Sequence, residues 1–255
     1  MSHCEKMDLM SKKKITGFKR KFVRRCTQIK WASLIVAGFL TVNYAVQIVR
    51  KPTEALGIVP TTKKTPLQTW QSYRDEFRNS ATTIITPDFL AAIAQVESSG
   101  DPVAQPKWVW RWTTDIFRIY APESSAVGLM QITEGNFAEA KYYCVRYGKV
   151  ETNCWLNNLY ARFWPSHSIE IAAAFMHVQV EKFLALYRLS SVKRESQQRL
   201  AAVIHLCGKG RAPEFIKNKF RVGSSFQRCG THDPKDYLNK VGIYQRQFSR
   251  MLASE

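Results

Sequence analysis

The chain has 255 residues, which is enough for one large domain or two small ones. It carries 38 Lys and Arg against 20 Asp and Glu, a formal net charge of +18. Such an excess points to an anionic partner, such as nucleic acid, an anionic membrane surface or a cell wall. Residues 1–30 hold ten basic residues and two acids, which gives +8 there and leaves +10 on the remainder. Because the basic residues cluster beside an apolar segment, we expect no nucleic-acid partner.

An uncharged stretch of 19 residues, 31–49, follows the basic tail at residues 1–30. Its length is close to the roughly 20 residues that an α-helix needs to cross a bilayer core. Positive charge stays on the cytoplasmic side of a membrane, so we predict a transmembrane signal anchor with a cytoplasmic tail. Residues after the anchor are then outside the cytoplasm. A cleaved signal peptide and a buried helix of a soluble domain are the alternatives.

Residues 50–69 contain three prolines and no apolar periodicity, which predicts a linker. Residues 70–255 are expected to form one predominantly α-helical domain with at most a small β-hairpin. A leading helix from about residue 67 to 79 places Trp70, Tyr73 and Phe77 on one face, where they can pack on the domain.

A strongly apolar stretch, residues 89–100, ends in a carboxylate. Thr86 suits an N-cap and Pro87 suits the first helical position, so we predict a buried helix here, with Gly100 as its C-cap. Glu97 lies at the negative end of the helix dipole beside apolar surface, and both effects favour the protonated carboxyl group. A carboxyl group held in this form can act as a general acid. The alternative is a solvated Glu at a helix end.

Three tryptophans alternate with other residues in the segment 107–112, which predicts a short strand with an indole-rich face. Two interpretations are open, namely a wall that stacks on sugar rings at the edge of a cleft, or a hairpin that buries its aromatic side chains. Gly128, further along, marks a tight turn or a close backbone approach.

The rest of the chain shows helical apolar spacing, and Pro165 is expected to separate two of the helices. The longest periodic run, residues 168–188, is the predicted central core helix. The predicted helices are 151–164, 168–188, 191–206 and a final helix that begins at Asp233-Pro234.

Four cysteines follow the apolar segment, and an even number outside the cytoplasm indicates two disulfides. We favour the most local pairings, Cys144–Cys154 and Cys207–Cys229, with free buried thiols as the alternative. No Cys-x-x-Cys spacing occurs and the histidines are scattered, so we predict no metal site. We expect no cofactor.

Two blocks of residues resemble the signature of the soluble lytic transglycosylase (SLT) catalytic domain, a lysozyme-like family related to goose-type lysozyme. They are Glu-Ser-Ser-Gly-Asp-Pro at 97–102 and Ala-Val-Gly-Leu-Met-Gln-Ile at 126–132. A third family block, Ala-Tyr-Asn-Ala-Gly-x-Gly, has a partial counterpart at 200–212. There His205 and Leu206 replace the family's Tyr and Asn. The resemblance covers roughly residues 70–222 and looks closest to transglycosylases encoded with conjugation machinery, particularly that of integrative conjugative elements, or with secretion machinery.

The resemblance implies cleavage of the β-1,4 bond between N-acetylmuramic acid and N-acetylglucosamine in peptidoglycan. Glu97 would be the single general acid and base, and the product would carry a 1,6-anhydro ring. No other acid near the motifs has a comparable apolar helical setting. The substrate-binding residues that the resemblance implies are Ser98, which should also orient Glu97, together with Gly128, Leu129, Met130, Gln131 and His205.

Two other functions stay open at this point. One is a hydrolytic muramidase on the same fold, and the other is a catalytically weak wall-binding scaffold, with His205 and Leu206 as signs of drift. The implied location is the bacterial inner membrane, with the domain in the periplasm. The implied partners are peptidoglycan glycan strands, the inner membrane through the N-terminal helix, and a conjugation or secretion complex.

Overall fold

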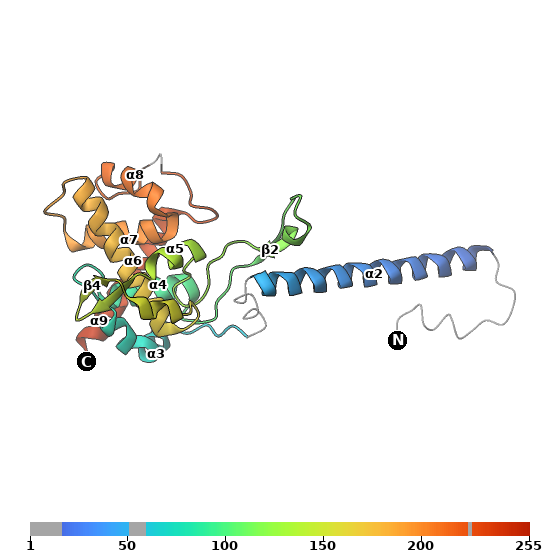
Figure 1. Cartoon of the computed structure of the whole chain (residues 1–255), viewed down its shortest axis with the longest axis horizontal. Coiled ribbons are helices and arrows are strands. Elements are labelled where there is room, and N and C mark those ends of the chain that lie inside the picture. Colours follow the sequence, from blue (N-terminus) through green and yellow to red (C-terminus); the bar gives the residue numbers. More distant parts are fainter. Residues whose placement is uncertain (1–16, 51–59, 224–225) are drawn as a thin grey trace. The chain divides into compact units, whose positions relative to one another are not determined.

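The computed structural model describes residues 17–50, 60–223 and 226–255 (Figure 1). It separates into two compact units, one with α2 and the segment 108–121, the other with residues 60–107 and the described residues from 122 onward. The first 16 residues of the predicted basic tail, and residues 51–59 of the predicted linker, lie outside the described residues.

The first unit contains α2, Gly17–Arg50, which includes the predicted anchor. Within it, Thr27–Val49 is the one segment in the described residues that is long and apolar enough to cross a membrane. The unit also contains β1, Trp108–Trp110, which pairs with β2, Tyr120–Pro122, and the short 3-10 helix η2, Ile116–Arg118. The predicted indole-rich strand is therefore confirmed as part of a hairpin.

The second unit is mainly helical, as predicted, and its β structure is one antiparallel hairpin in which Tyr143 faces Thr152. Its helices are α3 (Pro66–Asn79), α4 (Pro87–Ser98), α5 (Glu134–Ala140), α6 (Pro165–Leu186), α7 (Arg194–Cys207), α8 (Ala212–Lys217) and α9 (Pro234–Ala253). The hairpin consists of β3 (Tyr143–Arg146) and β4 (Lys149–Thr152), and two 3-10 helices, η3 (Trp155–Leu159) and η4 (Lys209–Arg211), complete the unit.

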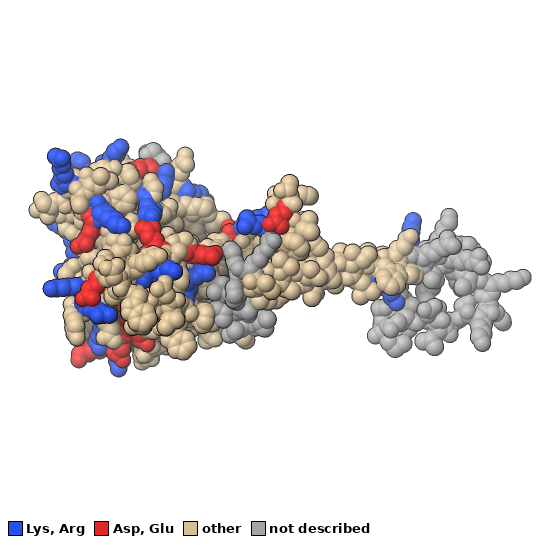
Figure 2. Space-filling model, viewed as in Figure 1, with Lys and Arg blue, Asp and Glu red and all other residues tan. Residues whose placement is uncertain are grey.

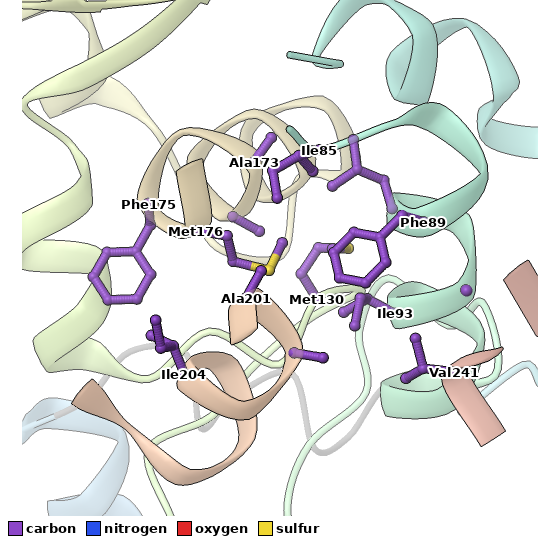
Figure 3. Packing of buried hydrophobic residues seen from close by; sticks show 14 of the residues in the cluster. Ile85, Phe89, Ile93, Met130, Ala173, Phe175, Met176, Ala201, Ile204 and Val241 are labelled. Carbon is purple, nitrogen blue, oxygen red and sulfur yellow. The ribbon is translucent and has the colours of Figure 1, made fainter. Parts of the chain in front are cut away.

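The core is built around α4, whose residues from Phe89 to Ala94 are all inaccessible to solvent or nearly so. Buried alanines on α4, α6 and α7 let the backbones of these helices approach closely, because an alanine side chain adds little bulk between helix axes. Figure 3 shows Phe89 and Ile93 of α4 pointing toward Met130 and Met176. The predicted central helix is confirmed as α6, which buries eleven residues along its length.

Local sequence signals explain where the helices begin. Thr65 and Gln68 form a capping box at the start of α3. The side chain of Asp233 accepts hydrogen bonds from the first backbone N–H groups of α9, at Lys235 and Asp236. Each of these helices also has proline in its first turn, where a missing N–H costs nothing.

The predicted helix at 151–164 is wrong. Residues 149–152 form β4 instead, and only the short η3 follows. The Cys144–Cys154 disulfide ties β3 to the chain just after β4, and Asn153 adopts a positive φ of 66° that breaks any helix. Pro165 begins α6 as its first residue, so too little chain remains for a regular helix.

Both favoured disulfides, Cys144–Cys154 and Cys207–Cys229, are present. The first fastens the β3–β4 hairpin. The second joins the end of α7 to the loop before α9, and so restrains that loop close to the helix that carries His205.

Candidate active site

Glu97 lies in the last turn of α4, with 16% of its side chain exposed. The helix ends one residue earlier than predicted, because Ser99 takes the left-handed C-cap position with φ 54° and Gly100 follows with φ 73°. A Cβ at Gly100 would lie 2.2 Å from Thr69 Oγ1. The close approach of α3 therefore requires glycine here and fixes the direction in which the chain leaves Glu97.

Tyr237 of α9 donates a hydrogen bond from its hydroxyl to Glu97 Oε1 at 2.5 Å. Burial, together with the negative charge of Glu97 and this hydrogen bond, raises the pKa of Tyr237 well above its ordinary value. The hydroxyl thus stays protonated and remains a donor over the whole range in which a carboxyl group titrates. The sequence predicted the helix that carries Tyr237 but did not identify this residue as a partner of Glu97.

His205, near the end of α7, is the second residue beside the carboxyl group. Its Nε2 lies 3.6 Å from the same oxygen, Glu97 Oε1, and its side chain is only 6% exposed. This separation exceeds normal hydrogen-bond length but allows attraction between a protonated imidazole and a carboxylate. Tyr237 and His205 both approach Oε1, and no hydrogen bond or ion pair from the described residues is recorded at Oε2.

The predicted turn at Gly128 forms and is fastened on two sides. Gly128 has φ 83°, and a Cβ there would lie 2.2 Å from the carbonyl oxygen of Arg162. The side-chain amide of Gln131 donates to the carbonyl oxygens of Ala104 and Gly128, at 3.0 and 2.9 Å. Arg162 donates from Nη1 to the carbonyl oxygens of Ser125 and Ile132, which flank the turn. Arg162 was not singled out from the sequence.

Ser98 connects this turn to α4, the helix that carries Glu97. Its hydroxyl lies 2.8 Å from the carbonyl oxygen of Leu129 and 2.9 Å from that of Ala94. The side chain therefore holds the turn against the residue next to Glu97. Leu129 and Met130 are themselves fully buried, so their side chains pack in the core. Gln131 is half-buried.

A second catalytic carboxyl group is not evident among the described acids near the motifs. Asp101 is buried, and its two oxygens accept hydrogen bonds from the backbone N–H groups of Thr62 and Val103. Both carboxylate oxygens of Asp101 thus stabilise the loop after α4, so we do not assign Asp101 a part in the chemistry. Glu123 and Glu134 are exposed. Glu97 combines partial burial with a hydrogen bond from the Tyr237 hydroxyl. Glu170 of α6 has a similar donor in the hydroxyl of Tyr160, but it lies outside the two motifs.

Replacing Gly128 by Ala should unfold or displace the turn, because alanine adds a Cβ against the Arg162 carbonyl at a φ that disfavours side chains. We expect the free energy of unfolding to fall by about 2 kcal/mol or more. Chemical denaturation of the full chain in detergent, followed by near-UV circular dichroism, measures this. Gly135→Ala is the control, since a Cβ there meets nothing within 4 Å. Equal stability of both variants would contradict the account of the turn.

Comparison with protein-family models matches residues 76–219 to the transglycosylase SLT domain. The match covers more than half of the chain and contains Glu97, the Gly128 turn and His205, but it stops before α9 and Tyr237. A search of curated proteins finds no match. The helical core with two short hairpins agrees with a lysozyme-like fold. The chain therefore belongs to the family of the transglycosylase SLT domain, and the resemblance noted in its motifs is confirmed at the level of the family.

Proposed function

We propose that this protein is a membrane-anchored lytic transglycosylase that cleaves peptidoglycan glycan strands. The observation that carries the proposal is Glu97, whose side chain is 16% exposed at the end of a buried helix, with Tyr237 donating a hydrogen bond to its Oε1. A pure binding domain has no need for a carboxyl group held in this manner. Membership of the SLT family supplies the substrate class, peptidoglycan.

The proposed reaction uses one carboxyl group twice. Glu97 Oε2 delivers its proton to the oxygen that links N-acetylmuramic acid to N-acetylglucosamine, and the C1–O4 bond breaks. The substrate's own N-acetyl group stabilises C1 while the charge develops. Oε2 then takes the proton from the O6 hydroxyl as O6 bonds to C1, which gives the 1,6-anhydro ring and restores the acid. The reaction consumes no water.

Tyr237 suits both halves of this cycle. Its hydroxyl donates to Oε1 when that oxygen is a carbonyl, and the bond strengthens when the carboxylate forms, since charged acceptors bind donors more strongly. Oε1 is thereby fixed, which leaves Oε2 as the oxygen that exchanges protons. We propose the substrate contacts at Ser98, Gly128, Leu129, Met130, Gln131 and His205, with Leu129 and Met130 acting through the backbone of the turn because their side chains are buried.

The proposed location is the bacterial inner membrane, with the domain in the periplasm. Figure 2 shows that the surface of α2 between Thr27 and Val49 is almost free of charged side chains. The two disulfides suit an oxidising compartment. An enzyme that α2 holds on the outer side of the inner membrane would lie next to the peptidoglycan wall. We further propose local wall opening during assembly of a conjugation or secretion apparatus, for which the support is the motif resemblance.

Glu97→Gln should lower the release of soluble muropeptides from purified peptidoglycan by about 100-fold or more, because general acid–base catalysis contributes about 10²–10⁴-fold. The full chain in detergent is the enzyme, and Glu134→Gln, an exposed acid near the same motifs, is the control. Wild-type release by the Glu97 variant would overturn the proposal. If wild type releases nothing but binds the wall, the scaffold alternative is favoured.

Tyr237→Phe should lower turnover by about 10-fold to 100-fold, since a hydrogen bond to a charged group contributes about 1.5–3 kcal/mol. Tyr244→Phe, on the same helix, is the matched control. Wild-type turnover in the Tyr237 variant would mean that this tyrosine only packs.

His205→Ala should reduce turnover without unfolding the domain, because the imidazole lies beside the carboxyl oxygen and contributes its charge or a hydrogen bond during the reaction. The thermal midpoint by circular dichroism and the muropeptide release rate are measured on the same preparation. Wild-type turnover in this variant would leave His205 with a structural role alone.

A further inference from the structure

The candidate membrane span carries two polar side chains that are buried although most of the helix is exposed. Asn43 is 1% and Gln47 is 6% exposed, and their spacing of four residues places them on one face of α2. Uncharged amides are costly in an apolar span unless they are hydrogen-bonded, and such residues in membrane helices usually have a specific partner.

That partner is the segment 108–121, which we name the indole hairpin. The side-chain amide of Asn43 donates to the carbonyl oxygen of Ile116 at 3.4 Å, and that of Gln47 donates to the carbonyl oxygen of Phe117. The ring of Tyr44 lies 5.5 Å from that of Trp108. The hairpin is thus docked on the polar face of α2 near the end of the span.

The docked hairpin leaves large apolar side chains uncovered. Trp110 is 64% exposed, Trp112 fully exposed and Ile116 54% exposed, so the expectation of a hairpin that buries its aromatic residues is wrong for these positions. Indole rings have an apolar body and a polar N–H, and tryptophan is enriched where hydrocarbon meets headgroups. The same short segment also carries Arg111, Arg118 and Asp115, of which Asp115 pairs with Arg118 at 3.7 Å, and the net positive charge that remains suits anionic headgroups.

The depth of the docking site agrees with an interfacial position. Asn43 precedes the end of the span, Val49, by six residues, which is about 9 Å along a helix axis. Interfacial elements bury their apolar side by about 5–10 Å. Backbone groups at that depth need partners within the protein, and the amides of Asn43 and Gln47 supply them to two hairpin carbonyls.

We propose that the indole hairpin is a second membrane contact, which inserts Trp110, Trp112 and Ile116 into the outer leaflet of the bilayer that α2 crosses. This inference rests on the proposed membrane anchor. The hairpin is joined to the other unit through Lys107 and Pro122, and α2 is joined to that unit through the linker before α3. The enzyme is thereby kept at the membrane-proximal side of the wall.

Tryptophan quenching by brominated lipids tests the proposal on the full chain, reconstituted in vesicles of phosphatidylglycerol and phosphatidylcholine. Bromine placed near the headgroups should quench emission in wild type. Trp110→Phe with Trp112→Phe should lose the hairpin's share of that shallow quenching and keep the share that comes from Trp31, near the other end of the span. Trp155→Phe with Trp164→Phe is the matched control, because these indoles are also exposed but lie in the other unit. The control should quench as wild type does.

Quenching of Trp31, which is exposed on α2, distinguishes failure of this inference from failure of the proposed membrane anchor. If Trp31 is quenched but the Trp110 and Trp112 double variant behaves like wild type, the hairpin does not touch lipid and the inference is overturned. If no variant shows any quenching, the anchor itself has failed, and the inference fails with it.

The docking contact has its own test. Asn43→Leu with Gln47→Leu should release the hairpin and speed trypsin cleavage at Arg111 and Arg118 several-fold in the same vesicles. Thr41→Leu with Ser33→Leu is the control, since those hydroxyl groups are exposed and bond only to the backbone of α2. Equal cleavage in both double variants would contradict the docking.

Discussion

The packing of α9 against α4 is the constraint on which the proposed catalytic centre depends. It brings Tyr237 within 2.5 Å of Glu97 Oε1, across 140 residues of sequence. A carboxyl group at the end of a buried helix is unfavourable unless a donor meets it, because burial penalises the charge. The donor here is itself buried and cannot ionise in the working pH range, so the pair forms a fixed unit. Chain outside the matched family region thus completes the site.

The second requirement is that the Gly128 turn cannot move relative to that carboxyl group. Ser98 bonds the turn beside it, and Gly128 lets the turn touch the Arg162 backbone. Met130 extends from the same turn into the core, where Figure 3 places it near Ile93. The proposed substrate contacts therefore move only if the core moves, which is what positioning of a sugar ring requires.

Local signals predicted the elements that matter most. Thr86 and Pro87 predicted the start of α4, and Asp233 and Pro234 that of α9. The apolar period predicted α6 as the central helix, although α6 begins at Pro165 and not at residue 168. The helix predicted at 151–164 is absent. Trp155, Leu156 and Leu159 have helical spacing, but their side chains are exposed, so the spacing does not reflect packing against the core. The hydrogen bond between Tyr237 and Glu97 could not be predicted from the sequence, because periodicity shows which face of a helix is buried but not which distant residue a side chain contacts. The docking of the indole hairpin on Asn43 and Gln47 was beyond reach for the same reason.

The central claim is that one carboxyl group suffices, with the substrate's O6 in place of water. Digestion of peptidoglycan by the full chain in water enriched with oxygen-18, followed by mass spectrometry of the released muropeptides, tests it most directly. The account predicts anhydro ends that carry no heavy oxygen, formed by wild type and lost in Glu97→Gln. Ends that are heavier by one labelled water would contradict it and identify the protein as a muramidase on the same fold.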